Sequence, residues 1–135
     1  MTVRNLDRAL HPRSVAVIGA SAVPGAIGAT VLRNIRAGAF AGAVWPVCPD
    51  ALQLMDLPCV PDIAALPGVP DLAVLALPPE ALPQAVADLG ARGERLAVAL
   101  GRGPGPDGPL RQRMLQAARP HLLRLIGPDS IGMLV

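Results

Sequence analysis

The fold is decided by residues 14–28, which read Ser-Val-Ala-Val-Ile-Gly-Ala-Ser-Ala-Val-Pro-Gly-Ala-Ile-Gly. The four residues from Val15 to Ile18 form a short apolar run of the kind that a parallel strand needs when both of its faces are covered. Gly19 ends this run, and a glycine-rich turn follows it. The stretch therefore predicts a buried strand that leads through a tight turn into a helix.

The glycines of this turn predict a phosphate-binding site. Gly25 and Gly28 have no side chain, so the backbone can approach a ligand and the helix can pack closely on the strand. Free N–H groups at the start of the helix would then face a phosphate. The spacing departs from the dinucleotide fingerprint G-x-G-x-x-G, because Ser21 stands at the second glycine and the loop is longer. We therefore expect a nucleotide-containing cofactor; the alternative is that the glycines only turn the strand into the helix.

Composition excludes several classes of function. The chain of 135 residues is one domain that can bury a core without disulfides or metals. Phe40 and Trp45 are its only aromatic residues, so the core must be aliphatic and stacking platforms for single-stranded nucleic acid are absent. All 12 basic residues are scattered arginines, which argues against nucleic-acid binding. Residues 14–32 carry no charge, but Pro24 and the glycines favour a strand–helix unit over a membrane span.

Two cysteines, Cys48 and Cys59, stand in a chain without a signal peptide. This predicts a reducing cytoplasm and unpaired, buried thiols. The thiols and the two histidines, His11 and His121, are too dispersed for a recognised ligand spacing, so we expect no metal site. The absence of lysine excludes Schiff-base chemistry and a Walker-type phosphate site.

Strand and helix patterns alternate along the chain. Strands are predicted at residues 14–20, 43–48, 71–77, 95–101 and 123–126, with a weaker one near Cys59. Apolar residues at helical spacing lie between them, at residues 27–35, from 79 to 90 or 93, and at 110–118. This alternation predicts an α/β, Rossmann-like three-layer domain with a mostly parallel sheet. The Gly/Pro-rich residues 101–109 follow a strand and are a candidate ligand loop.

The stretch from Leu6 to Gly28 resembles the CoA-binding domain that opens the ADP-forming acyl-CoA synthetases. Similar domains occur in the succinyl-CoA ligase alpha subunit and in bacterial protein acetyltransferases that carry a GNAT domain. The resemblance continues through Leu57-Pro58-Cys59, Asp71-Leu72-Ala73-Val74, Leu77-Pro78-Pro79 and Gly127-Pro128-Asp129. It implies that residues 1–135 form a Rossmann-like domain that holds CoA or acyl-CoA and works with further ligase or acetyltransferase domains. A second copy of the chain, in a homo-oligomer, is a further candidate partner.

The resemblance also implies the parts of the site. Residues 21–28 would surround the pyrophosphate and the start of the pantetheine, residues 47–50 would lie near the adenosine, and residues 77–79 would follow the adenine or pantetheine arm. Arg102 could clamp a phosphate or simply face solvent. The candidate cofactor-binding residues are Gly19, Ser21, Val23, Pro24, Gly25, Ala26, Gly28, Cys48, Pro49, Asp50, Leu77, Pro78, Pro79 and Arg102. We expect no catalytic residue, because neither histidine lies in a phosphohistidine motif.

Departures from the family pattern keep two alternatives open. Relatives often have Asn-Pro-Lys after the second strand, where this chain has Cys48-Pro49-Asp50, and the loop at residues 101–104 also differs. One alternative is an NAD-binding domain of an oxidoreductase, since Asp50 falls 22 residues after Gly28 (50 − 28) and a carboxylate there could accept the ribose 2′-OH. The other is a degenerate regulatory domain with an empty crevice. The chain ends where relatives continue into a next domain, which predicts an excised fragment.

Overall fold

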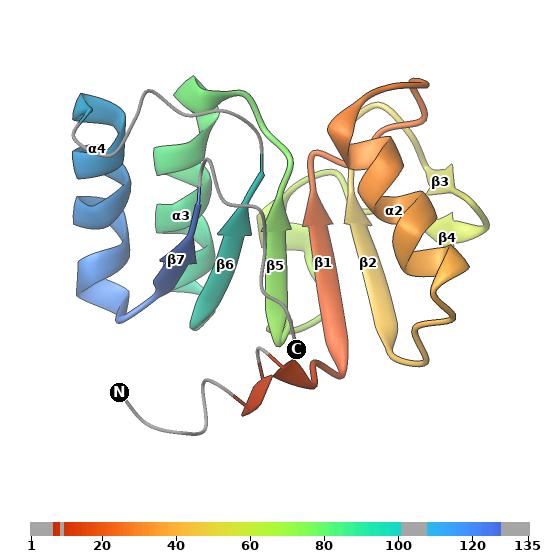
Figure 1. The fold of residues 1–135 in the computed structure, drawn as a ribbon, viewed down its shortest axis with the longest axis horizontal. Coiled ribbons are helices and arrows are strands. Elements are labelled where there is room, and N and C mark those ends of the chain that lie inside the picture. The colour runs from red at the N-terminus through yellow and green to blue at the C-terminus, as the bar shows by residue number, and fades with distance from the viewer. Residues whose placement is uncertain (1–6, 9, 101–107, 128–135) are drawn as a thin grey trace.

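The computed structural model describes residues 7–8, 10–100 and 108–127. Within them a five-stranded, all-parallel sheet has the order β2-β1-β5-β6-β7 (Figure 1). Its strands are β1 (Ser14–Ile18), β2 (Ala43–Val47), β5 (Leu72–Leu75), β6 (Leu96–Ala99) and β7 (Arg124–Ile126). The covering helices are α2 (Ile27–Ala37), α3 (Leu82–Ala91) and α4 (Pro109–Ala118), and no helix in the described ranges is long and apolar enough to cross a membrane. The predicted α/β, Rossmann-like fold is confirmed.

The two faces of the sheet bury separate aliphatic clusters. Ala16 and Ile18 of β1 point to the face covered by α3 and α4, where they join the larger cluster. Val15 and Val17 alternate to the other face and pack with Leu32 of α2. All four β1 residues are less than 5% exposed, as the apolar run predicted for a strand covered on both sides. The helices thus form the two outer layers around the sheet (Figure 1).

Several element boundaries differ from the predicted ones. β1, β2, β5 and β6 end one to two residues earlier than predicted within the described part, because the chain turns into loops at their carboxyl ends. A 3-10 turn, Pro79–Ala81, precedes α3, which was expected to begin at Pro79. The region before Cys59 forms a hairpin of β3 (Gln53–Leu54) and β4 (Leu57–Pro58), and only Val60 bridges to β2. Of the predicted ligand loop, residues 101–107 lie outside the described residues.

Candidate functional site

The carboxyl end of β1 is joined to the ends of β2 and β5 through Gly19. The N–H groups of Gly19 and Ala20 both donate to the carbonyl of Val47 at 3.2 Å, and Ala76 N–H donates to the carbonyl of Ile18 at 2.8 Å. A Cβ on Gly19 would collide with the carbonyl oxygen of Ala76, and its φ of +87° lies in the left-handed region. Only glycine therefore fits at this junction.

The other two glycines of the turn have different tasks. A Cβ on Gly28 would collide with the carbonyl oxygen of Gly19, so the first turn of α2 touches the end of β1 backbone to backbone. Gly25 has a φ of +86°, and nothing lies within 4 Å of its missing Cβ. Gly28 is thus required for packing, whereas Gly25 holds an open, left-handed loop next to the helix start.

The start of α2 presents free backbone donors. Its N-cap, Ala26, offers no side-chain hydrogen bond, and the first turn carries no acidic residue. Thr30 is the first residue whose N–H bonds into the helix, to the carbonyl of Ala26 at 3.1 Å. The N–H groups of Ile27, Gly28 and Ala29 have no partner among the described residues. This arrangement is suited to an anion, because the unpaired donors and the helix dipole both favour negative charge.

The loop between β1 and α2 is shaped by Ser21. Its hydroxyl oxygen accepts the N–H of Val23 at 3.0 Å, and Ala26 N–H closes the next turn on the carbonyl of Val23 at 3.1 Å. The Ser21 hydroxyl proton remains able to donate to a ligand. Val23, Pro24 and Gly25 are exposed, so the loop stands open to solvent beside the α2 donors.

Two pockets open at the same edge of the sheet. One, of about 250 Å³, lies between the start of α2 and the ends of β5 and β6, and is lined by Ile27, Ala76, Leu77, Pro78, Pro79, Leu82 and Leu100. The other, of about 330 Å³, is lined by the ends of β1 and β2 and by α3, and includes Gly19, Pro49, Asp62, Leu77 and Asp88. Leu77 lines both pockets. The structure thus brings residues 77–79 to the start of α2, although about 50 residues separate them in sequence.

The residues after β2 divide between core and surface. Cys48 is 7% exposed and packs in the cluster beneath α2, while its N–H donates to the carbonyl of Val60 at 2.9 Å. Burial, followed by the nearby Cys48 thiol, raises the pKa of Cys59. Both cysteines are free, with Cys59 only partly buried. Asp50 is exposed at the carboxyl end of β2, and Arg102 lies outside the described residues.

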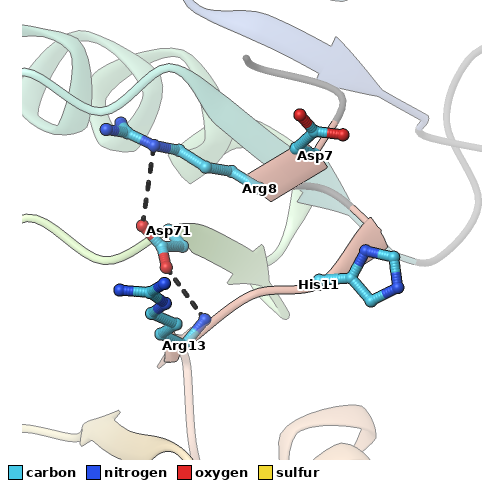
Figure 2. A pocket seen from close by; sticks show the side chains of 5 residues that line it. All are labelled: Asp7, Arg8, His11, Arg13 and Asp71. Atoms are coloured by element: carbon cyan, nitrogen blue, oxygen red, sulfur yellow. Dashed lines mark hydrogen bonds and ion pairs between the residues drawn. The ribbon is translucent and has the colours of Figure 1, made fainter. Parts of the chain in front are cut away.

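A further pocket, about 440 Å³, lies at the opposite edge, where β1 and β5 begin (Figure 2). Asp71 is its central residue: one carboxylate oxygen accepts the N–H of Arg13 at 2.8 Å, and the other lies 3.9 Å from Nε of Arg8. The N–H of Asp71 donates to the hydroxyl of Ser14 at 3.0 Å. These contacts tie the segment before β1 to the start of β5. Sequence reasoning did not single out this cluster.

Glu94 is a second carboxyl group at this edge, and the sequence analysis did not predict its burial. It is 1% exposed; Oε1 accepts the N–H groups of Arg95 at 3.0 Å and Leu96 at 3.1 Å, while Oε2 has no partner among the described residues. Burial raises the pKa of Glu94 to about 7. The two backbone hydrogen bonds and Arg8 oppose that rise, and Asp71 adds to it. No periodic pattern in the sequence marks such a residue.

The fold and the β1–α2 junction define a Rossmann-type α/β domain, with the glycine-rich turn leading into the start of α2. The family model described as "CoA binding domain" matches residues 13–135. The chain belongs to this CoA-binding domain family.

Several named proteins are similar to this chain over nearly its whole length. The chain is 33% identical over 137 residues to "Acetate--CoA ligase [ADP-forming] II" of Archaeoglobus fulgidus, covering 98% of this chain and 20% of the relative. It is 38% identical over 133 residues to a trans-feruloyl-CoA synthase from an unknown prokaryotic organism, covering 96% of this chain and 19% of the relative. The solved apo structure of the dinucleotide-forming acetyl-coenzyme A synthetase 1 of Candidatus Korarchaeum cryptofilum is similar with a TM-score of 0.87 and 33% identity, over 94% of this chain and 28% of that one. The chain spans about a fifth of the length of these curated relatives.

Proposed function

We propose that this chain is the CoA-binding module of an ADP-forming acyl-CoA synthetase-like protein and holds CoA or an acyl-CoA across the carboxyl ends of β1, β2 and β5. The observation that carries the proposal is the row of free N–H groups at Ile27, Gly28 and Ala29, which opens beside two pockets in a chain of the CoA-binding domain family. The pyrophosphate is the anion that this row would bind.

The surroundings of the α2 donors support an orientation for the ligand. The pocket at Ile27, Leu77 and Pro78 is lined by apolar side chains, which suits the uncharged pantetheine arm and the acyl group that follows it. The exposed residues Pro49 and Asp50 after β2 are then left for the adenosine. This orientation follows what the resemblance implies, in which residues 47–50 lie near the adenosine and residues 77–79 follow the adenine or pantetheine arm.

The chain supplies binding and no chemistry of its own in this proposal. The purified domain should make no acetyl-CoA from acetate, ATP and CoA, and the phosphorylated nucleophile and the nucleotide grasp would come from other domains of the parent protein. Relatives named as acetate–CoA ligases favour an acid–CoA ligase over an acetyltransferase fusion as the parent. A reducing cytoplasm suits its two free thiols.

Calorimetric titration of the domain with CoA, acetyl-CoA and NAD tests the proposal. We expect CoA and acetyl-CoA to bind at one site per chain and NAD to release no comparable heat, since neither the family match nor the relatives favour an NAD site. Binding of NAD alone would support the dehydrogenase alternative. Absence of heat with all three ligands would support the alternative of an empty crevice.

A further inference from the structure

The ligand edge contains no cationic side chain in the loops that follow β1, β2 and β5. No Lys, Arg or His stands between Arg13 and Arg33 or between Arg36 and Arg92, and these intervals contain all three loops. Arg33 and Arg36 lie six and nine residues into α2, about 9 and 13 Å along the helix from its start. The phosphate-binding capacity of these three loops therefore rests on backbone N–H groups and the Ser21 hydroxyl.

The side that would hold the adenosine is acidic. Asp50 is exposed directly after β2, and Asp62 and Asp88 line the pocket that includes Pro49. Glu80, on the turn before α3, is exposed at the same edge. Arg102 lies outside the described residues. None of these carboxylates has an ion-pair partner within the described residues.

These exposed carboxylates would repel one particular group of CoA. The 3′-phosphate on its ribose carries a charge of about −1.5 to −2, as other phosphate monoesters do near neutral pH. Beside Asp50 it would meet a like charge, and the loops that follow β1, β2 and β5 offer it no cation. A ribose with free hydroxyls would instead donate hydrogen bonds to the same carboxylate, which only accepts them.

We infer that this site selects an adenosine 5′-diphosphoryl ligand whose ribose is not phosphorylated, so that 3′-dephospho-CoA binds more tightly than CoA. The inference rests on the proposed function for the orientation of the ligand and adds its ribose chemistry. ADP and NAD carry the same unphosphorylated ribose, and they differ from 3′-dephospho-CoA in lacking the pantetheine arm.

The test is calorimetric titration of the whole chain at low salt with 3′-dephospho-CoA, CoA, ADP and NAD. We expect 3′-dephospho-CoA to bind about tenfold more tightly than CoA, the size expected for these charges about 6 Å apart in water. The ratio should shrink at high salt, since screening weakens the repulsion. ADP and NAD should bind more weakly than 3′-dephospho-CoA, because they do not fill the apolar pocket at Ile27 and Leu77.

Variants of Asp50 locate the effect. Asp50→Asn should strengthen CoA binding and so reduce the ratio of the affinities for 3′-dephospho-CoA and CoA. Asp50→Lys should reverse this preference, so that CoA binds more tightly. Asp7→Asn is the matched control, because it removes one exposed carboxylate at the opposite edge of the sheet and should leave the ratio unchanged. Circular dichroism checks that each variant is folded.

The outcomes separate this inference from the proposed function. If CoA binds as tightly as 3′-dephospho-CoA, or if Asp50→Asn leaves their ratio unchanged, the ribose selectivity is wrong while CoA binding stands. If ADP or NAD binds as tightly as 3′-dephospho-CoA, the selectivity for an unphosphorylated ribose is supported and the proposed CoA site is contradicted. If no ligand binds, both are overturned.

Discussion

The two edges of the sheet differ in the surroundings of their charged and hydrogen-bonding groups. The amino edge is the one at which the strands begin, and the carboxyl edge is the one at which they end. At the amino edge, Asp71 and one oxygen of Glu94 accept backbone N–H groups from Arg13, Arg95 and Leu96. The second oxygen of Glu94 is buried without a partner among the described residues. At the carboxyl edge the donors are backbone N–H groups that have no partner among the described residues, and the carboxylates are exposed. The larger pocket lies at the first edge and the family's ligand is proposed at the second. The proposed ligand site is therefore chosen by its unpaired donors and not by the size of its pockets.

The largest effect should come from obstructing the close backbone contact between α2 and β1. Gly28→Val would place branched carbons on the carbonyl of Gly19, and because both partners are backbone the clash can be relieved only by moving the helix. We expect a loss of more than about 4 kcal/mol in the free energy of unfolding, measured by urea denaturation. Gly38→Ala, at the other end of α2 with φ −77°, should cost far less. Equal losses in the two variants would contradict the assigned packing role of Gly28.

The next effect concerns the amino edge and its pH dependence. The pKa of Glu94 in the folded state, about 7, lies above its ordinary value of 4.5, so the folded chain holds a proton that the unfolded chain releases. The stability that this group contributes is present below pH 4.5 and is lost as pH rises through about 7, up to about 3 kcal/mol. In Glu94→Gln this decrease in the free energy of unfolding should be absent when denaturation curves are recorded between pH 4.5 and 8. Glu80→Gln, exposed at the ligand edge, is the control and should keep it.

A third effect should separate binding from stability at the ligand edge. Gly25→Val forces a branched residue into a left-handed conformation in open space, at a cost of about 1–3 kcal/mol, and obstructs the approach of the phosphate. CoA affinity should fall at least tenfold in calorimetry while the fold survives. Gly93→Val is a matched control, because φ is +100° there, the nearest atom to its missing Cβ is 3.8 Å away, and the residue lies close to the amino edge, before β6. Unchanged CoA affinity in folded Gly25→Val would place the ligand elsewhere.

The smallest effect should come from Arg8→Ala. The Arg8–Asp71 pair is long at 3.9 Å, and the Arg8 side chain is 58% exposed, so its removal should cost about 0.5 kcal/mol or less in thermal or urea unfolding. Ligand affinity should not change. A loss above about 2 kcal/mol would mean that the segment before β1 depends on this pair far more than its geometry indicates.

The sequence predicted what periodicity and glycine placement control. The apolar run from Val15 to Ile18 and the three glycines predicted the β1–α2 unit, and the alternation of patterns predicted the parallel sheet. Boundaries were less accurate, because strand ends such as Ile18 depend on where a neighbouring carbonyl can pair. The hairpin before Cys59 was expected as a weak strand, since short paired segments leave little periodic signal.

The amino-edge cluster could not be predicted in the same way. Asp71 is an ordinary acidic residue in the sequence, and its partner Arg13, at a separation of 58 residues, is set only by the folded sheet. Glu94 accepts the N–H groups of the next two residues, but its burial is set by the folded sheet. Burial of a single charged residue also carries no periodic signature. The residues proposed around the ligand remain predictions, with Leu77 and Pro78 placed beside the start of α2 by the sheet order.

The backbone contact between Gly28 and Gly19 has a consequence for the thermodynamics of ligand capture. No side chain lies between the first turn of α2 and the end of β1, so the helix cannot settle closer to the strand when a phosphate arrives. The N–H groups of Ile27, Gly28 and Ala29 are therefore aligned before binding, and little conformational entropy remains to be lost in ordering them. Any ordering that accompanies capture of the ligand falls on the open loop around Gly25, whose left-handed glycine permits that movement.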